Sequence, residues 1–345
     1  MPRAISSPDQ FVTVGENIHA TRVVLRNGRK TTTLENGTEA VPFTDEDGEQ
    51  RFLTVPDWYK KTQPYDQGQI KHFMIAARKG IGDDTDEAAE GAAYVHAEIR
   101  RQTEAGADFL DLNVDEISPN LDVQKRAMAW LVETFQEKST LPPRIDSSNS
   151  EIIAEGLTHY DGRAGKPMIN SCSLERLETL DSVVEYGARV IVTAAGDAGM
   201  PQDDEERVEN ADRVMAAAAA RGVPLGDMYV DGLVFPISVD QQSGGHYFDA
   251  VRELRNRYGP EIHITGGLSN VSFGLPKRRL INDTFIYLAL EAGIDSGIID
   301  PVQSKMSAVF DLDMDSERMK LAADMLLGRD EFCMSFIKAY RDGRL

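Results

Sequence analysis

The feature that most constrains the fold is a regular alternation, from about residue 86 to residue 327, of helix-forming stretches with short runs rich in Val, Ile and Leu. Short apolar runs separated by helices are typical of a parallel sheet whose strands are buried on both faces. With an earlier run at 11–16 there are eight strands, and eight such units indicate a closed (β/α)8 barrel, the TIM-barrel fold of the α/β class. The strands are expected at 11–16, 109–114, 142–148, 167–173, 189–195, 228–236, from 264, and at 296–301.

The helices between these runs are expected at 86–105, 123–137, 151–159, 174–186, 204–221, 247–257, 282–292 and 316–327. The alternative architecture is a doubly wound open sheet, in which the first strand commonly leads into a G-x-G-x-x-G turn. Here the first run leads into GENIHA (15–20) instead, so a dinucleotide-binding fold is disfavoured. No low-complexity linker interrupts 86–330, and we therefore predict a single domain over 1–345.

An insertion at 26–66 separates the first strand from the rest of the repeat. It contains two Asn-Gly pairs, Asn27-Gly28 and Asn36-Gly37, and later an acidic DEDGE turn. Asn-Gly between β-prone residues is the strongest short signal for a β-hairpin. We therefore expect an inserted N-terminal β-hairpin arm, which could cover one mouth of the barrel or make a subunit contact.

The charge balance excludes several classes of partner. The 37 basic and 57 acidic residues give a net charge of −20 (37 − 57), which repels nucleic acid phosphates and anionic membrane surfaces. No stretch reaches the about 20 apolar residues of a membrane span, and the N-terminus lacks the apolar core of a signal peptide. We therefore expect a cytoplasmic protein without nucleic acid or membrane partners, in which Cys172 and Cys333 are reduced thiols.

Polar side chains stand where the predicted strands end, which is where the active sites of such barrels lie. Any one of them has an ordinary alternative role, because Asp, Asn and Ser commonly cap helices or start turns. A carboxylate or carboxamide at the end of nearly every strand is harder to explain by turns alone. The residues at these positions are Glu16, Asn113, Asp146, Asn170, Asp231, Asn270 and Asp300.

The stretch around Asn270 shows this pattern in its sharpest form. A short apolar run that starts at Ile264 breaks at Gly266 and Gly267, and Asn270 then lies between two serines. Without long side chains nearby, the glycines could leave room for a flat ligand against the backbone. The alternative interpretation is a strand followed by a polar turn, since Gly, Asn and Ser are common turn formers.

Asp and Asn side chains without a histidine cluster suit a neutral heterocycle with several N–H donors, because carboxylates accept such bonds and carboxamides both donate and accept. A pterin ring fits this description. The rival use of carboxylates is a metal site, but the six histidines form no His-x-His pair and the two cysteines no C-x-x-C pair. We therefore predict no metal site. His19 lies near a strand end, where it could support a binding residue or contact the edge of the substrate.

The chain contains, in order, the segments GENI (15–18), LDLNV (110–114), IDSSN (145–149), MINS (168–171), YVDGLVFP (229–236), GLSNVS (267–272) and RRLIN (278–282). In this order and spacing they resemble the pterin-binding methyltransferases. The resemblance is closest to the methyltetrahydrofolate:corrinoid protein methyltransferases and to the folate domain of cobalamin-dependent methionine synthase. It covers the chain from about residue 86 to the end together with GENI, and it leaves out the arm at 26–66.

The resemblance implies a methyltransferase that moves a methyl group between N5 of tetrahydrofolate and the cobalt of a separate corrinoid protein, in a direction that the sequence leaves open. Tetrahydrofolate or 5-methyltetrahydrofolate would be the folate substrate, the partner protein would supply the cobalamin, and relatives suggest a homodimer. By position, Asp146, Asn170 and Asp231 match residues that hydrogen-bond the pterin ring. Asn270 matches a mobile asparagine beside N5, which makes it the candidate catalytic residue, and Arg278 matches a basic position near the bound cofactor.

Asn113, Glu16 and His19 complete the set of candidate substrate-binding residues. Two positions depart from the family pattern: His19 stands where relatives often have Asn, and Phe273 follows GLSNVS where a relative has a polar residue. The chain has no D-x-H-x-x-G loop of a cobalamin domain, so the corrinoid has to come from elsewhere.

Two other functions stay open. One is a condensation of a pterin with aminobenzoate, as in dihydropteroate synthase, which the family resembles in fold; that enzyme's phosphate-handling Lys and its Ser-x-Arg signature are not evident here. The other is a folate-binding protein without catalytic activity.

Overall fold

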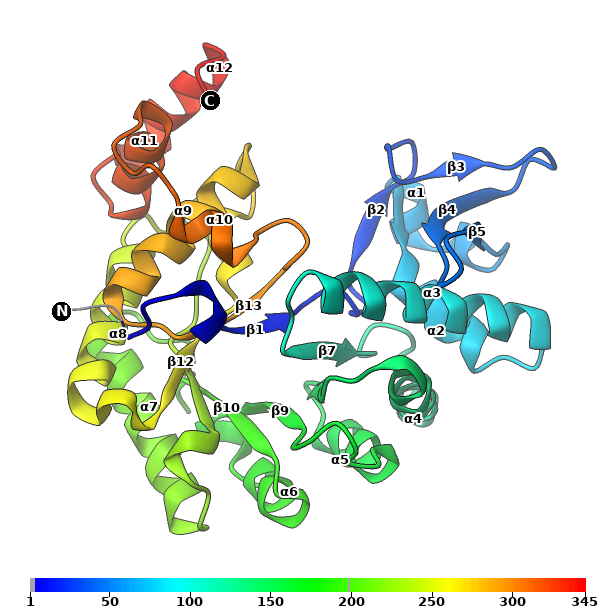
Figure 1. Ribbon diagram of the computed structural model, residues 1–345, viewed down its shortest axis with the longest axis horizontal. Helices are drawn as coiled ribbons and strands as arrows, with labels where there is room; N and C mark the ends of the chain where they lie inside the picture. The colour runs from blue at the N-terminus through cyan, green and yellow to red at the C-terminus, as the bar shows by residue number, and fades with distance from the viewer. Residues whose placement is uncertain (1–3, 198) are drawn as a thin grey trace. The chain divides into compact units, whose positions relative to one another are not determined.

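The computed structural model describes residues 4–197 and 199–345 (Figure 1). The chain divides into two compact units. Unit 1 runs up to Val14 and resumes over Ile169–Leu345, whereas unit 2 consists of Gly15–Met168. The single domain expected over 1–345 stays a prediction.

The eight expected strands correspond to β1 and β7–β13, and the chain has the fold of a (β/α)8 barrel. Within unit 1 the strands follow one another in the order β9-β10-β11-β12, and β13 neighbours β1; within unit 2, β7 neighbours β8. The pairs β7–β8, β10–β11 and β11–β12 are parallel. Most residues of these strands are buried, as in β10, where Val190, Ile191 and Val192 are all inaccessible to solvent.

The elements of unit 1, with the last residue of β1 and the first of β9 belonging to unit 2, are β1 (Val12–Gly15), β9 (Met168–Cys172), α6 (Thr179–Tyr186), β10 (Arg189–Thr193), α7 (Asp204–Ala220), β11 (Met228–Asp231), α8 (Ser243–Tyr258), β12 (His263–Thr265), α9 (Arg278–Ala292), β13 (Ser296–Ile299), α10 (Met306–Phe310), α11 (Glu317–Leu326) and α12 (Met334–Arg341).

The elements of unit 2 are β2 (Val23–Leu25), β3 (Thr32–Thr33), β4 (Glu39–Thr44), β5 (Gln50–Thr54), α1 (Gln63–Asp66), β6 (Gln69–Lys71), α2 (His72–Gly80), α3 (Thr85–Glu104), β7 (Phe109–Asn113), α4 (Leu121–Lys138), β8 (Pro143–Asp146) and α5 (Ser150–His159).

Several helices begin at a polar side chain that binds the otherwise unpaired N–H groups of the first turn. Asp84 accepts hydrogen bonds from the backbone N–H groups of residues 86 and 87 at the start of α3. Asp203 accepts one from Glu206 at the start of α7. These caps explain why the predicted and observed starts of α3 and α7 agree within a residue.

The arm is a three-stranded antiparallel sheet, β3-β4-β5, rather than a single hairpin. Asn36-Gly37 makes the first turn with Gly37 at φ +83°, a conformation that favours glycine, and Gly48 in the DEDGE segment has the same φ. Asn27-Gly28 also makes a turn, in which the Gly28 N–H donates to the Leu25 carbonyl at 2.9 Å. It does not join two paired strands, because β2 pairs with β6.

Some helices differ from the expectation. The stretch 174–186 is not one helix, because α6 begins only at Thr179 after a short 3-10 turn at Leu174–Arg176. Helices α8 and α9 each begin four residues earlier than predicted, and α1, α2, α10 and α12 were not predicted. Over residues 4–197 and 199–345, no helix combines the length and the apolar character needed to cross a bilayer.

Candidate functional site

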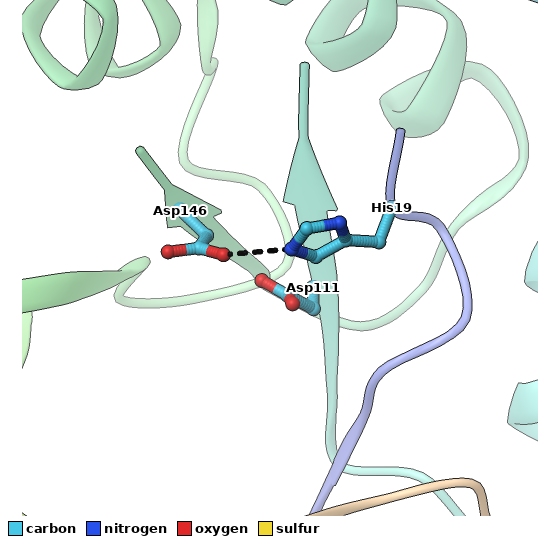
Figure 2. Close-up of side chains that lie close together, drawn as sticks. All are labelled: His19, Asp111 and Asp146. Carbon is cyan, nitrogen blue, oxygen red and sulfur yellow. Dashed lines mark ion pairs between the residues drawn. The ribbon is translucent and has the colours of Figure 1, made fainter. Parts of the chain in front are cut away.

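In unit 2, the candidate site is built on the ends of β7 and β8 and on the loop after β1 (Figure 2). The parallel register places Asn113 opposite Asp146, and it places Asp111, two residues earlier, opposite Arg144. Because alternate residues of a strand share a face, Asp111 and Asn113 lie one above the other on the same side of β7. Figure 2 shows the carboxylates of Asp111 and Asp146 turned toward the imidazole of His19.

Asn113 holds this group together with both its backbone and its side chain. Its Nδ2 donates to the Asp146 carboxylate at 3.0 Å and to the Asp146 carbonyl at 3.2 Å. Its backbone N–H donates to the Ile18 carbonyl at 3.2 Å, and its carbonyl accepts from the Ala20 N–H at 3.0 Å. The loop that carries His19 is therefore fixed against the end of β7.

His19 Nε2 lies 3.3 Å from Asp146 Oδ2. On its other side, in the neutral form of the ring, the Thr21 backbone N–H donates to His19 Nδ1 at 3.2 Å, which leaves the ring proton on Nε2, facing Asp146. Burial lowers the pKa of His19, but the hydrogen bond to Asp146 and the nearby charge of Asp111 raise it more, so that the net pKa lies above 6.5. Burial raises the pKa of Asp146, but His19 and Arg144 outweigh it and bring that pKa below its usual value.

Beneath this pair, the Arg144 guanidinium and the Asp111 carboxylate form an ion pair, with Nη1 and Oδ2 at 3.2 Å and both side chains only 3% exposed. Burial raises the pKa of Asp111 to about 7, although Arg144 acts in the opposite direction. Among the described residues, Asp111 Oδ1 and Arg144 Nε and Nη1 have no hydrogen-bond partner, so Nη1 contacts Asp111 as an ion pair without the geometry of a hydrogen bond. Asp111 was not identified from the sequence; the signal was a charged residue inside an otherwise apolar strand, which is rarely buried without a partner.

The same three residues, His19, Asp111 and Asp146, present ligand atoms that all lie within 4.8 Å of one another, a spacing that a metal ion could use. Arg144 already binds Asp111, and a cation would have to displace that contact. Glu16, in contrast, points to Arg22, whose Nη2 lies 2.5 Å from Glu16 Oε1 and whose Nε donates to the Glu16 carbonyl at 3.1 Å.

In unit 1, Asp231 is the last residue of β11 and is only 8% exposed. Its Oδ1 accepts a hydrogen bond from the Leu233 N–H at 2.7 Å. Leu233 has a φ of +63°, which is unusual for a residue other than glycine. Asn170 is half-buried in β9, and the peptide bond after it is cis. Asp300 accepts hydrogen bonds from the backbone N–H groups of residues 302 and 303, which is the turn-forming role that its position before a proline also allowed.

Asn270 lies in a short 3-10 helix, Leu268–Ser272, that follows β12. The space beside the preceding glycines is already occupied by protein atoms. A Cβ on Gly267 would lie 2.8 Å from Asn270 Nδ2, and a Cβ on Gly266 would lie 2.9 Å from the Tyr247 hydroxyl. The glycines therefore make room for the Asn270 carboxamide and for Tyr247, rather than for a ligand directly against the backbone.

Arg278 begins α9 and binds the same segment. Its Nε donates to Ser272 Oγ at 3.0 Å, its Nη2 donates to the Ser269 carbonyl at 3.0 Å, and its Cζ lies 4.6 Å from the centre of the Phe273 ring. The structure thus brings Asn270 and Arg278 onto one segment of unit 1, and His19, Asn113 and Asp146 into one group in unit 2. Convergence of Asp146, Asn170, Asp231 and Asn270 around one ligand stays a prediction.

The sequence is similar to those of known pterin-binding proteins. A family model described as pterin binding enzyme matches residues 84–300. The chain is 29% identical over 259 residues to a methylcorrinoid:tetrahydrofolate methyltransferase of Eubacterium limosum, which covers 73% of this chain and 89% of that protein. It is 34% identical over 213 residues to methionine synthase of Mycobacterium leprae, covering 57% of this chain but only 17% of that protein.

Two solved structures share the fold. A dihydropteroate synthase of Stenotrophomonas maltophilia superposes with a TM-score of 0.51 at 16% identity, over 66% of this chain and 87% of that one. A dihydropteroate synthase of Xanthomonas albilineans in complex with 7,8-dihydropteroate gives a TM-score of 0.50 at 20% identity, over 67% and 85% of the two chains. At these identities the likeness establishes the barrel fold and nothing more specific.

Proposed function

Because the chain belongs to the pterin binding enzyme family, we propose that it is a methyltransferase that moves a methyl group between N5 of tetrahydrofolate and the cobalt of a separate corrinoid protein. The observation that carries the proposal is the similarity to a methylcorrinoid:tetrahydrofolate methyltransferase along 89% of that protein's length.

Asp146, Asn170 and Asp231 would bind the pterin ring. A pterin presents a 2-amino group and ring N–H groups, and a carboxylate accepts two such bonds side by side while a carboxamide can donate to the ring carbonyl. The contacts described above suit Asp146 to this role, because Asn113 and His19 hold its carboxylate in place and lower its pKa, so that it remains ionised. Glu16, His19, Asn113 and Arg278 would act chiefly by positioning these groups.

Asn270 would act at N5. An amine is a poor leaving group unless it is protonated, so that loss of a methyl group from N5 requires a proton or a strong hydrogen bond there in the transition state. A carboxamide supplies such a bond without a charge of its own. The loop contacts of Arg278 with Ser269 and Ser272 would keep Asn270 within reach of N5.

The corrinoid would be bound by a partner protein and would serve as the methyl donor or acceptor. The candidate site suits a corrinoid held by a partner protein, because its only histidine among the described residues, His19, has both ring nitrogens in contact with Asp146 and Thr21, and the side chains proposed to bind the pterin are carboxylates and carboxamides. The pterin-condensing activity and the non-catalytic folate-binding protein remain alternatives, but the likeness to dihydropteroate synthase supports a shared fold alone.

The proposal is tested by mixing the purified protein with methylcobalamin and tetrahydrofolate, and following the cobalamin absorption spectrum together with formation of 5-methyltetrahydrofolate. Methyl transfer above the rate without protein supports the proposal. Binding of tetrahydrofolate without transfer, either to free cobalamin or from a methylated corrinoid protein, identifies a binding protein instead. Formation of a pterin–aminobenzoate product from pterin pyrophosphate and aminobenzoate identifies the condensing enzyme.

A further inference from the structure

Arg207 of α7 is among the largest side chains that are fully buried in this protein, at 1% exposure. Its Nε donates to the Gly232 carbonyl at 2.9 Å, and its Nη1 donates to the Asp203 carbonyl at 2.8 Å. Its Cζ lies 5.1 Å from the centre of the Phe235 ring. All of these residues belong to unit 1. A guanidinium is costly to bury, and these hydrogen bonds and the ring face offset part of that cost.

Gly232 lies between Asp231, a candidate pterin-binding residue, and Leu233, whose N–H binds the Asp231 carboxylate. It follows Asp231, and it precedes Leu233, which has a φ of +63° and donates its N–H to Asp231 Oδ1 at 2.7 Å. A bulky residue in the left-handed region is strained and persists only where its surroundings hold it. Arg207 binds the carbonyl of Gly232, which lies between Asp231 and Leu233, and so restrains the backbone of this turn. The Leu233 N–H restrains the Asp231 carboxylate itself.

We propose that Arg207 is a positioning residue that sets the orientation of the Asp231 carboxylate for the pterin ring. The inference rests on the proposed function, in which Asp231 binds the pterin. The rigid fork of a guanidinium suits this role, because Nε and Nη1 can bind the Gly232 and Asp203 carbonyls at once and so tie the end of β11 to the start of α7. Lysine has a single charged nitrogen on a flexible stem and cannot reproduce this geometry.

Arg255 of α8 offers a matched control within the same unit. Its Nε donates to the Gly293 carbonyl at 2.9 Å, and its Nη1 donates to the Gly259 and Ile262 carbonyls at 2.7 and 2.9 Å. It is therefore also an arginine that binds backbone carbonyls, and its Nη2 in addition lies 3.2 Å from Asp295 Oδ1. Those carbonyls precede β12 and β13, at the ends of the strands opposite to the carboxyl ends that carry the candidate site residues.

The experiment measures equilibrium binding of tetrahydrofolate, and of tetrahydropterin without the aminobenzoyl-glutamate tail, to the full-length chain and to the variants R207M, R207K and R255M. Thermal unfolding of each variant is recorded in parallel. We expect R207M to raise the dissociation constant of both ligands about tenfold, equivalent to 1.4 kcal/mol, and R207K to give a smaller increase. R255M should lose comparable thermal stability and bind both ligands like the wild type.

The proposal is overturned if folded R207M binds tetrahydropterin like the wild type, or if R255M weakens binding as much as R207M does, since the effect would then follow stability alone. If R207M does not fold, R207K decides by the same criterion. Failure of the wild type to bind either ligand contradicts the proposed function itself. That outcome is distinct from a wild type that binds and an Arg207 variant that binds equally well.

Discussion

Replacing Gly267 with alanine would test the role of Asn270 without touching the carboxamide itself. The backbone of Gly267 has φ −73° and ψ 74°, close to an inverse γ-turn that alanine also adopts, so the substitution introduces no backbone strain. The added Cβ would lie 2.8 Å from Asn270 Nδ2, where ordinary contact begins at 3.4 Å. The carboxamide must therefore shift by about 0.6 Å (3.4 − 2.8).

The expected cost follows from this displacement. A misplacement of about 1 Å at a reacting centre lowers the rate by about 100-fold, so a shift of about 0.6 Å predicts a loss of about 15-fold. Because the proposed hydrogen bond from Asn270 strengthens in the transition state, the loss should appear in kcat, with little change in KM for tetrahydrofolate.

The assay is methyl transfer between methylcobalamin and tetrahydrofolate, followed by the cobalamin spectrum at varied folate concentration. Gly226→Ala is the matched control, because a Cβ there would meet no atom within 4 Å and the residue precedes β11, at the other end of that strand from Asp231. Wild-type kcat and KM for Gly267→Ala would refute the reasoning. A raised KM with unchanged kcat would show that Asn270 binds the substrate and takes no part in the chemical step.

Three further outcomes are expected. Asn270→Ala should lower kcat about 100-fold while the dissociation constant of tetrahydrofolate changes far less, and equal losses in both would contradict a role in the transition state. The pKa of His19 is raised above 6.5, so its interaction with Asp146 stabilises the fold fully below that pH and ceases to do so as the pH rises through the raised pKa. The difference in unfolding free energy between wild type and His19→Asn should therefore be larger at about pH 5.5 than at about pH 8.5, and a constant difference argues against the ion pair. At about pH 8.5, above the pKa of Asp111, Asp111→Asn leaves Arg144 charged and buried, so chemical denaturation should show a loss of about 3 kcal/mol that the double variant Asp111→Leu/Arg144→Met largely recovers.

The strands could be predicted closely because each is a short stretch with several apolar residues, and burial on both faces favours such stretches in a parallel sheet. The exception is β11, which was expected at 228–236 but ends at Asp231. The helix starts were less predictable. α9 begins at Arg278 directly after Lys277, which has a left-handed φ of +57° and no capping side-chain bond, so that no Ser, Thr, Asp or Asn marks its start. The break before α6 likewise follows no glycine or proline in the sequence.

Candidate site residues could be predicted where they end a strand. Residues that matter because their charged side chains are buried were harder to predict. Asn113 and Asp146 were expected at strand ends, and the parallel register places them opposite each other. Arg207 lies within the acidic stretch DDEERVENADR, which is typical of a solvated helix face, and only the structure shows that its side chain is buried. The pairing of Asp111 with Arg144 also depends on strand register, which a single sequence does not specify.

The two ends of the arm lie next to each other. Leu25 of β2 pairs with Gln69 of β6, and the Arg26 N–H donates to the Gly68 carbonyl. A short turn could therefore bridge residues 25 and 69 without redirecting either flank. Between the arm and α3 lies a cavity of about 690 Å³ lined in part by Ala89, Ala93 and Ala97. Loss of the arm would leave the path of the polypeptide on either side unchanged, but it would remove Thr54, whose hydroxyl accepts a hydrogen bond from the buried Lys79 ammonium.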